Sequence, residues 1–415
     1  IQVVESAKGN NYDIFTQVKL FVKMFSLVVE AQLNTTEVQE LIADTNQHFD
    51  LLLIEACFKP GLIFSHFYNA PVILVSSFGT LDEFIGWTGA SLHPILYPTI
   101  THQRLNDLTL LEKVMEVIKH YVFERITAAQ ELEDDKMLRK RFGVDVPPLK
   151  QLTKNVALIF LDVHRIWDNN RPVPPNVIYL GGLHMANKEL DSYLNSSSHG
   201  VIYMSLGTNT SPSILPRDTI QCLLKVFSEL PYDVILKWDK DELPGLPANV
   251  KIFKWLPQSD LLSDEAIIAG VPMIGMPMLG DQWYNVEQYV RHSIGLRLDI
   301  QSLTEEKLTS AIQTAINHKI YRANIINLRN QLYDQPQTSL ERAVWWTEHI
   351  IRQGGGKHLL ASGAFVSWTE YCEIEVVVAV LAGIMLVLGT FGAVLYVMVM
   401  FIGQIFLATK KIKEN

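Results

Sequence analysis

The sequence predicts an α/β protein with two doubly wound, Rossmann-like domains followed by one C-terminal transmembrane helix. Short apolar runs, typical of buried parallel strands, alternate with helical patterns along most of the chain. The length of 415 residues suits two domains, each able to bury a full core. Residues 376–409 carry no charge, and about 20 apolar residues are enough to cross a bilayer core.

The first domain is expected over residues 1–170. Its apolar runs and helical patterns alternate as in βαβ units, which build doubly wound sheets. The expected strands cover 51–55, 71–75 and 156–161, and the expected helical patterns fall within 1–48 and at 62–68. Glu55 stands at the end of the first strand.

A long charged helix is expected over residues 104–142, and Pro147 and Pro148 follow it as helix breakers. It carries an amphipathic stripe of the kind that normally faces a protein core. The stripe consists of Leu108, Leu111, Val114, Met115 and Ile118. The charged run 131–136 is most simply a solvated face.

The second domain is expected over residues 171–350, after a linker at 168–175 that is rich in turn-forming residues. The run 176–182 would open this domain. Further strands are expected over 201–206, 234–238 and 250–253, with helices from about 288 to 351. Gly207 and Thr208 directly follow a strand, and a glycine there lets the backbone approach a ligand.

The stretch 255–287 carries the side chains that suggest a ligand site. They are an aromatic residue, two amides and two acids, namely Trp255, Gln258, Glu265, Asp281 and Gln282. Ligands of open α/β sheets lie outside the carboxyl ends of the strands, which would gather these residues around one pocket. Such a set without a basic cluster suits a flat base and a polyol. An ordinary β-α-β unit with surface acids is the alternative interpretation.

The order of these residues resembles the signature region of the UDP-glycosyltransferase family, in particular its membrane-bound animal branch. The matching pieces are WLPQSDLL, an acid before AGVPMI, and PMLGDQ. The pieces GGLH at 181–184 and MSLGTN at 204–209 and the C-terminal anchor add to the resemblance, which runs from about Phe49 to the end. It implies the two-domain GT-B fold.

The resemblance also implies a role for each matching residue in holding the sugar donor. Trp255 would stack on uracil, Gln258 would form a hydrogen bond with the uridine, and Glu265 would hold the ribose hydroxyls. Asp281 and Gln282 would bind the hydroxyls of the transferred sugar. Gly207 and Thr208 would lie beside the diphosphate. These seven positions are the predicted donor site.

The signature contains an internal gap. Only six residues, 259–264, separate Gln258 from Glu265, where the family has a helix end, a strand and a glycine turn. A strand needs about 4–8 residues and each connection about 2–6, so this unit cannot fit. Its turn and following helix start would supply the N–H groups that hold the diphosphate. We therefore expect the phosphate cradle to be missing.

No residue of the sequence can be assigned as the catalytic base. The resemblance makes Glu55 the carboxylate partner of a catalytic histidine, whereas an acid that caps the next helix is the alternative. His48 and His66 are the nearest histidines, and neither matches the family position. Because the chain opens at Ile1 without a signal-like leader, we expect it to be incomplete at its N-terminus.

The C-terminal region predicts a single-pass anchor over 376–403, between a juxtamembrane segment at 351–375 and a tail at 404–415. Acidic residues precede the apolar run and lysines follow it, so the tail is expected in the cytosol and the domains in the lumen. The ending KIKEN resembles a dilysine signal for the endoplasmic reticulum, with a stop-transfer anchor as the alternative. Sequons at Asn34, Asn195 and Asn209 suit a lumenal glycoprotein.

Composition excludes several classes of function. The net charge of −9 and the absence of a long basic run argue against a nucleic-acid partner. The three cysteines are too few for a disulfide framework, and no group of residues has zinc-like spacing. We expect no metal and no cofactor, with a UDP-sugar as co-substrate.

These observations predict an inverting transferase that moves glucose or glucuronate from a UDP-sugar to a small lipophilic acceptor, as in detoxification. The missing base and cradle predict that this form is impaired. The alternative is a non-catalytic membrane partner that forms oligomers with intact glycosyltransferases. A weaker alternative is a membrane-tethered binding protein for lipophilic molecules.

Overall fold

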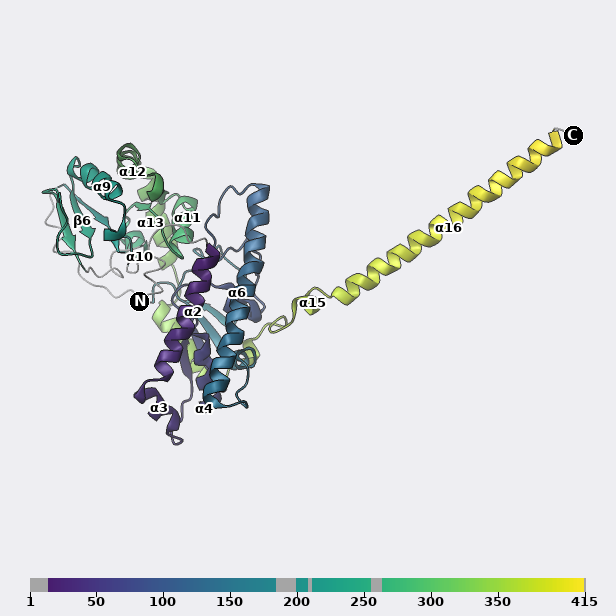
Figure 1. Cartoon of the computed structure of the whole chain (residues 1–415), viewed down its shortest axis with the longest axis horizontal. Coiled ribbons are helices and arrows are strands. Elements are labelled where there is room, and N and C mark those ends of the chain that lie inside the picture. Colours follow the sequence, from purple (N-terminus) through teal and green to yellow (C-terminus); the bar gives the residue numbers. More distant parts are fainter. Residues whose placement is uncertain (1–13, 184–198, 208–210, 255–262, 414–415) are drawn as a thin grey trace. The chain divides into compact units, whose positions relative to one another are not determined.

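The computed structural model describes residues 14–183, 199–207, 211–254 and 263–413. The chain forms two compact units, Ile1–Ala361 and Ser362–Asn415. The first unit holds all the described strands, and the second holds a long C-terminal helix (Figure 1). The first unit contains parallel sheets flanked by helices, as predicted from the alternation of apolar runs and helical patterns.

The first sheet has four parallel strands in the order β1-β2-β3-β4. They cover Leu52–Glu55 (β1), Val72–Ser76 (β2), Val156–Leu161 (β3) and Val177–Tyr179 (β4). Every residue of β3 is buried, which explains its continuous apolar sequence. The sequence placed the β4 run at the start of the second domain, but β4 pairs with β3 and completes the first sheet.

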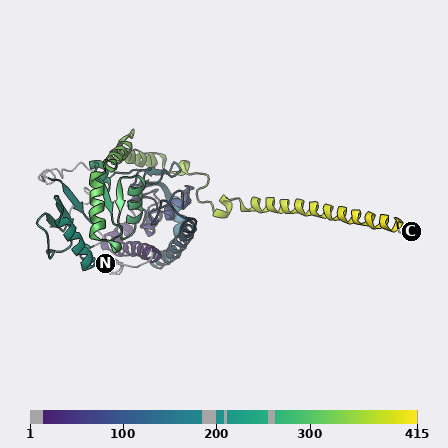
Figure 2. The same cartoon turned by 90° about the horizontal axis from the view of Figure 1, so that it is seen from above.

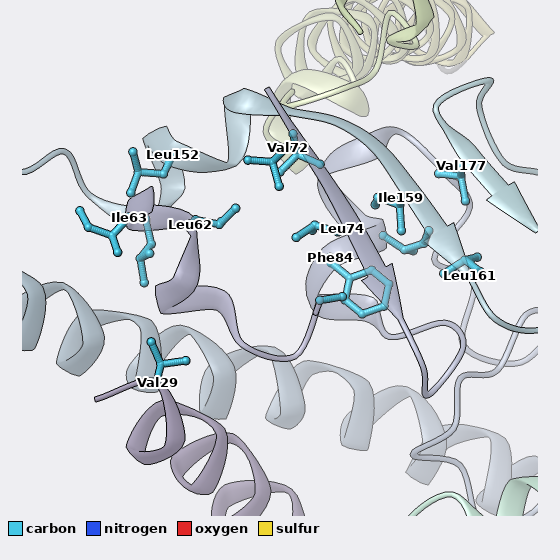
Figure 3. Packing of buried hydrophobic residues seen from close by; sticks show 14 of the residues in the cluster. Val29, Leu62, Ile63, Val72, Leu74, Phe84, Leu152, Ile159, Leu161 and Val177 are labelled. Atoms are coloured by element: carbon cyan, nitrogen blue, oxygen red, sulfur yellow. The ribbon is translucent and has the colours of Figure 1, made fainter. Parts of the chain in front are cut away.

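Helices cover both faces of this sheet. On one face lie α2 (Ile14–Leu33), α3 (Thr36–Ala43), α4 (Ile63–Tyr68), α5 (Asp82–Ile85), α6 (Leu110–Phe142) and α7 (Leu149–Leu152). Figure 3 shows their core, where Leu74 and Ile159 from the sheet lie beside Leu62 and Phe84. α2 and α6 pack side by side (Figure 1), and a hydrogen bond of 3.0 Å joins Ser26 to Asp134 between them.

Helix α14 (Ser339–Gln353) packs on the other face of the first sheet, where Ala343 and Ile350 join a core with Leu158 and Phe160. The chain therefore returns to the first sheet after the strands and helices of the second half. A capping box formed by Thr338 and Glu341 begins the helix.

The first turns of α6 face opposite to the predicted direction. Among the stripe residues, Leu111 is 71% exposed and Ile118 is 47% exposed, whereas Glu116 and His120 are buried. These two side chains face polar partners in the segment between β2 and α6, His120 facing Asp82 of α5 and Glu116 facing His102, so the apolar stripe points to solvent. The charged run 131–136 is also only partly solvated, because Asp134 is buried on Ser26.

The second half of the first unit contains two separate parallel sheets. One has the order β5-β6-β7 and the other pairs β8 with β9. The strands cover Val201–Met204 (β5), Asp233–Lys237 (β6), Val250–Phe253 (β7), Met273–Gly275 (β8) and Gly295–Arg297 (β9). Since β5 and β8 are the edges of different sheets, no strand joins them within the described ranges.

In the described part of this half, helices surround these sheets. They are α9 (Arg217–Ser228), α10 (Ser263–Ala269), α11 (Gln282–Arg291), α12 (Glu305–Asn317) and α13 (Lys319–Tyr333). Leu308 and Ile312 of α12 pack into the core of the three-stranded sheet, and Ile325 of α13 packs with Ile267 of α10 and Met273 of β8.

The second unit contains α15 (Trp368–Tyr371) and α16 (Ile374–Lys413). α16 runs as one unbroken helix in both views (Figures 1 and 2). Its segment Ile374–Ile405 has 32 residues and a mean hydropathy of 2.5, so it is long and apolar enough to cross a membrane.

Candidate active site

The candidate site lies at the carboxyl ends of strands from both halves of the first unit. Glu55 ends β1, Gly207 follows β5, and Asp281 and Gln282 follow β8 at the start of α11. Parallel strands bind ligands at this edge, as the sequence interpretation assumed. The structure brings Gly207 and Gln282 into direct contact and places Asp281 beside a loop that touches α2.

The side-chain amide of Gln282 joins the two separate sheets of the second half. Its Oε1 accepts hydrogen bonds from the backbone N–H groups of Met278 (2.8 Å) and Leu279 (3.2 Å). Its Nε2 donates at 3.2 Å to the carbonyl oxygen of Leu206, two residues after the end of β5. The amide carries a second N–H in addition to this one, so the predicted role on the sugar rests on that group.

Gly207 allows this close approach between the sheets. Its φ of +94° lies in the region that glycine tolerates, and a Cβ there would lie 3.3 Å from Gln282 Nε2. Its carbonyl accepts a hydrogen bond of 2.8 Å from Lys237 Nζ, and its N–H donates to Ser205 Oγ. The glycine is therefore needed for the junction itself as well as for the approach of a ligand.

Asp281 is a half-buried carboxylate at the N-terminus of α11. Burial raises the pKa of its carboxyl above the ordinary value. Its Oδ2 accepts a hydrogen bond of 3.0 Å from Asn285 Nδ2, and Asn285 Oδ1 accepts one of 3.0 Å from the Trp167 indole. This network reaches the segment between β3 and β4, and the sequence interpretation missed it.

An aromatic cluster links the two halves of the site. Phe25 of α2 packs against Phe21 (6.4 Å between ring centroids), Phe58 (5.6 Å) and Phe78 (6.1 Å). Phe58 follows β1 and Phe78 follows β2, so three elements contribute to this aromatic wall. The Phe21 ring lies within 3.9 Å of where a Cβ on Gly280 would be, and Gln17 Oε1 accepts from the Gly280 N–H at 3.4 Å.

Glu55 lies close to this wall, and its carboxylate is bound by Ser77. Ser77 Oγ donates to Oε2 at 3.1 Å, and the Ser77 N–H donates to Oε1 at 3.5 Å. In the described part of the chain no histidine is hydrogen-bonded to Glu55. His48 is exposed and faces Asp50 at 3.7 Å, and His66 is exposed on α4. Both therefore lie away from the predicted partner.

A buried histidine cluster under α6 was missed by the sequence interpretation. His120 Nδ1 lies 3.1 Å from Asp82 Oδ2, and this hydrogen bond raises the pKa of His120. His102 Nε2 lies 3.7 Å from Glu116 Oε2, and burial lowers the pKa of His102. The signal was the inverted pattern of α6, where polar residues occupy the inward positions. Among the described residues, no group of His, Cys, Asp or Glu could hold a metal ion.

The remaining predicted donor residues fall outside the described part of the chain. These are Thr208, Trp255, Gln258 and the side chain of Glu265, whose backbone lies in α10. β7 ends at Phe253 and α10 begins at Ser263. The uridine end of the predicted site thus stays a prediction.

Comparison with known sequences gives the family. The chain matches the family of UDP-glucoronosyl and UDP-glucosyl transferases over residues 2–406. It is 33% identical over 385 residues to an ecdysteroid UDP-glucosyltransferase of Spodoptera littoralis nuclear polyhedrosis virus, covering 85% of this chain and 75% of the relative. It is 34% identical over 264 residues to UDP-glucosyltransferase 2 of Dactylopius coccus, covering 59% of this chain and 51% of the relative.

Solved structures with the same fold are also glycosyltransferases. A UDP-glucose:anthocyanidin 3-O-glucosyltransferase in complex with UDP superposes with a TM-score of 0.53 at 15% identity, covering 83% of each chain. A UDP-glucosyltransferase from Polygonum tinctorium gives 0.54 at 14% identity, covering 80% of this chain and 82% of that one. These likenesses show the GT-B fold that the sequence predicted, and the chain belongs to the UDP-glucoronosyl and UDP-glucosyl transferase family of inverting glycosyltransferases.

Proposed function

We propose that this chain binds a UDP-hexose in its second half and presents the sugar to a small lipophilic acceptor held by the aromatic wall. The observation that carries the proposal is the contact of α2 with Gly280, the residue before Asp281, where Gln17 accepts a hydrogen bond from the Gly280 N–H and the Phe21 ring lies 3.8 Å from the position of a Cβ. Transfer requires the sugar and the acceptor to meet, and at this contact the apolar surface of the first half reaches the predicted sugar-binding turn.

The printed names of the relatives favour a particular pair of substrates. Several are ecdysteroid UDP-glucosyltransferases, and another is a UDP-glucosyltransferase. We therefore favour UDP-glucose over UDP-glucuronate as the donor and a steroid-sized alcohol as the acceptor. The four phenylalanines of the wall suit such a ligand, because flat apolar rings gain from aromatic contacts.

Transfer by this chain is proposed to be slow. Removing one donor to a developing negative charge typically lowers a rate by about 10²–10³, and the internal gap removes the turn expected to hold the diphosphate. The separation of β5 from β8 supports this view, since a strand between them would have ended at the same edge. Glu55, bound to Ser77, would orient a base instead of acting as one.

A transfer assay tests this function. The full chain in detergent is incubated with radiolabelled UDP-glucose or UDP-glucuronate and a steroid or phenolic alcohol, beside an intact family member. We expect measurable glucoside at a rate at least about 10²-fold below the intact enzyme. Asp281→Ala should abolish the product, whereas Asp145→Ala, at an exposed turn, should not. Turnover equal to the intact enzyme would contradict slow transfer.

The second candidate is a non-catalytic partner of intact glycosyltransferases. Within the described residues, β5 and β8 are edge strands of their sheets, which favours this candidate because edge strands readily pair with another chain. It predicts co-purification with an intact relative and no affinity for UDP. Calorimetric titration with UDP separates the candidates, since binding supports a donor site in this chain.

The anchor is proposed to hold both functional halves in the lumen of the endoplasmic reticulum. Segment Ile374–Ile405 has the length and apolarity for one crossing. Glu373 precedes this segment and Glu375 lies in its first turn, and Lys410, Lys411 and Lys413 follow it. Since positive charge favours the cytosolic side, the tail is assigned to the cytosol. Protease protection of microsomes tests this, because only the tail should be cleaved before the membrane is opened.

A further inference from the structure

Trp167 lies in the segment between β3 and β4 and packs against α11 of the other half. Its carbonyl oxygen accepts hydrogen bonds from Tyr284 Oη at 2.7 Å and from Gln288 Nε2 at 2.9 Å. Its indole stacks on the His292 ring with centroids 5.7 Å apart and planes at 12°. Backbone and side chain are thus both fixed to α11 and the residue that follows it, so the indole N–H has a defined direction.

That N–H points to Asn285, which in turn contacts Asp281. Trp167 Nε1 donates to Asn285 Oδ1 at 3.0 Å, and Asn285 Nδ2 donates to Asp281 Oδ2 at 3.0 Å. An indole N–H can only donate, so it requires the oxygen of the amide on its side. The nitrogen of Asn285 must then face the carboxylate, which fixes both the orientation of the amide and the rotamer of Asp281.

The spacing of the three groups makes this arrangement possible. Asp281 and Asn285 are four positions apart at the start of α11, so their side chains lie on one face of the helix. Trp167 is 118 positions from Asn285 and belongs to the first half of the unit. Oδ2 of Asp281 is thereby held by Asn285, and we expect a ligand hydroxyl to donate to the carboxylate on its Oδ1 side.

We propose that Trp167 and Asn285 are positioning residues that set the Asp281 carboxylate for the hydroxyls of the donor sugar. Through Trp167, the first half of the unit would then influence the affinity of the second half for the sugar. This inference rests on the proposed role of Asp281. If the inference holds, substitutions of Trp167 and Asn285 weaken the binding of UDP-glucose but leave the binding of UDP unchanged.

Equilibrium binding separates these two parts. The full chain in detergent is titrated by calorimetry with UDP and with UDP-glucose, and the ratio of the two Kd values measures the grip on the sugar. Asp281→Asn removes the negative charge and so defines the share of sugar binding that depends on the carboxylate, while Gln282 stays in place. Trp167→Phe removes the indole N–H but keeps an aromatic ring against His292, and Asn285→Asp replaces the donor to Asp281 by a second carboxylate.

We expect Trp167→Phe to weaken UDP-glucose binding by roughly 3- to 10-fold and Asn285→Asp by more than 10-fold, with the Kd for UDP unchanged. In the Asp281→Asn background, Trp167→Phe should change nothing further. The control Trp345→Phe, at a side chain 45% exposed on α14, should leave both values unchanged.

Three outcomes would overturn the inference. An equal loss of UDP and UDP-glucose affinity would mean that Trp167 only packs the two halves together. Unchanged ratios in both variants would mean that Asp281 needs no support. An unchanged ratio in Asp281→Asn itself would show that the proposed sugar site is wrong, and the inference would fall with it. If Asn285→Asp shows no cooperative melting transition, the variant is not folded, and the inference is then tested with Trp167→Phe alone.

Discussion

The Nε2 atom of Gln282 lies 3.2 Å from the carbonyl oxygen of Leu206, and this hydrogen bond joins the end of β5 to the start of α11. The two residues belong to different sheets, between which the described residues supply no strand. The side-chain amide of Gln282 thus connects the two sheets by a hydrogen bond, whereas in an unbroken sheet backbone hydrogen bonds between neighbouring strands would connect them.

The first prediction concerns this amide. Gln282→Ala leaves the Met278 and Leu279 N–H groups and the Leu206 carbonyl without these partners, and each poorly compensated group costs free energy. We expect the free energy of unfolding to fall by about 1–3 kcal/mol in urea titrations. Gln313→Ala, at an exposed position of α12, should change it by less than about 0.5 kcal/mol. Equal effects of the two substitutions would contradict the role of Gln282.

The second prediction concerns Lys59, which lies between two carboxylates. Its Nζ is 2.6 Å from Glu131 Oε2 and 3.6 Å from Glu83 Oε1, with the lysine side chain only 16% exposed. Lys59→Met leaves two partly buried acids without a counter-ion, which typically costs about 3–5 kcal/mol.

The matched control for Lys59 is Lys136→Met. Lys136 pairs with Glu133 at 2.8 Å, but the two side chains are 72% and 64% exposed, so we expect a loss of about 0–1 kcal/mol. Chemical denaturation of both variants measures the difference. A loss for Lys59→Met no larger than that of the control would show that this cluster is solvated in the protein.

The longer strands of the first unit could be predicted from the sequence because their signal is local, whereas β9 lies within residues 288–351, where only helices were expected. The run VALIFL of β3 is uniformly apolar and every residue of it is buried. Its neighbour β4 could be recognised as a strand but not assigned to a sheet. Assignment depends on the pairing of Ile159 with Val177, and no local pattern encodes that pairing.

Site residues could be proposed from the sequence only where family motifs supplied them. Asp281 and Gln282 were proposed in this way, but the residues that hold them in place were not. Trp167 and Asn285 are 118 positions apart, and each alone has the appearance of an ordinary packing residue. The aromatic wall could not be predicted from the sequence for the same reason, because Phe21, Phe58 and Phe78 come from three segments that are distant along the chain.

The third prediction concerns pH. The hydrogen bond from His120 to Asp82 raises the pKa of His120 in the folded state above the ordinary value of 6.5. The charged pair therefore contributes stability that is fully present below pH 6.5 and is lost as the pH rises through the raised pKa. His120→Gln should lower the free energy of unfolding more at pH 5.5 than at pH 9.

Thermal unfolding at these two pH values measures the effect. His318→Gln is the control, because His318 is exposed at the end of α12, and its effect should be the same at both. A larger loss at pH 9 than at pH 5.5 for His120→Gln would mean that the histidine is buried in its neutral form, with Asp82 serving only as an acceptor.

The fourth prediction concerns Phe78, the phenylalanine of the aromatic wall that is 41% exposed. Because it is exposed, Phe78→Ala should cost little stability, whereas an acceptor packed on the wall would lose an aromatic contact worth about 0.5–1.5 kcal/mol. We expect the affinity for a radiolabelled ecdysteroid to fall by roughly 2- to 10-fold in equilibrium dialysis.

The affinity of Phe78→Ala for UDP should stay unchanged, since Phe78 lies on the first half. Leu132→Ala, at a side chain 62% exposed on α6, controls for loss of a surface apolar group. If Phe78→Ala and Leu132→Ala bind the steroid equally well, the acceptor lies elsewhere on the first half.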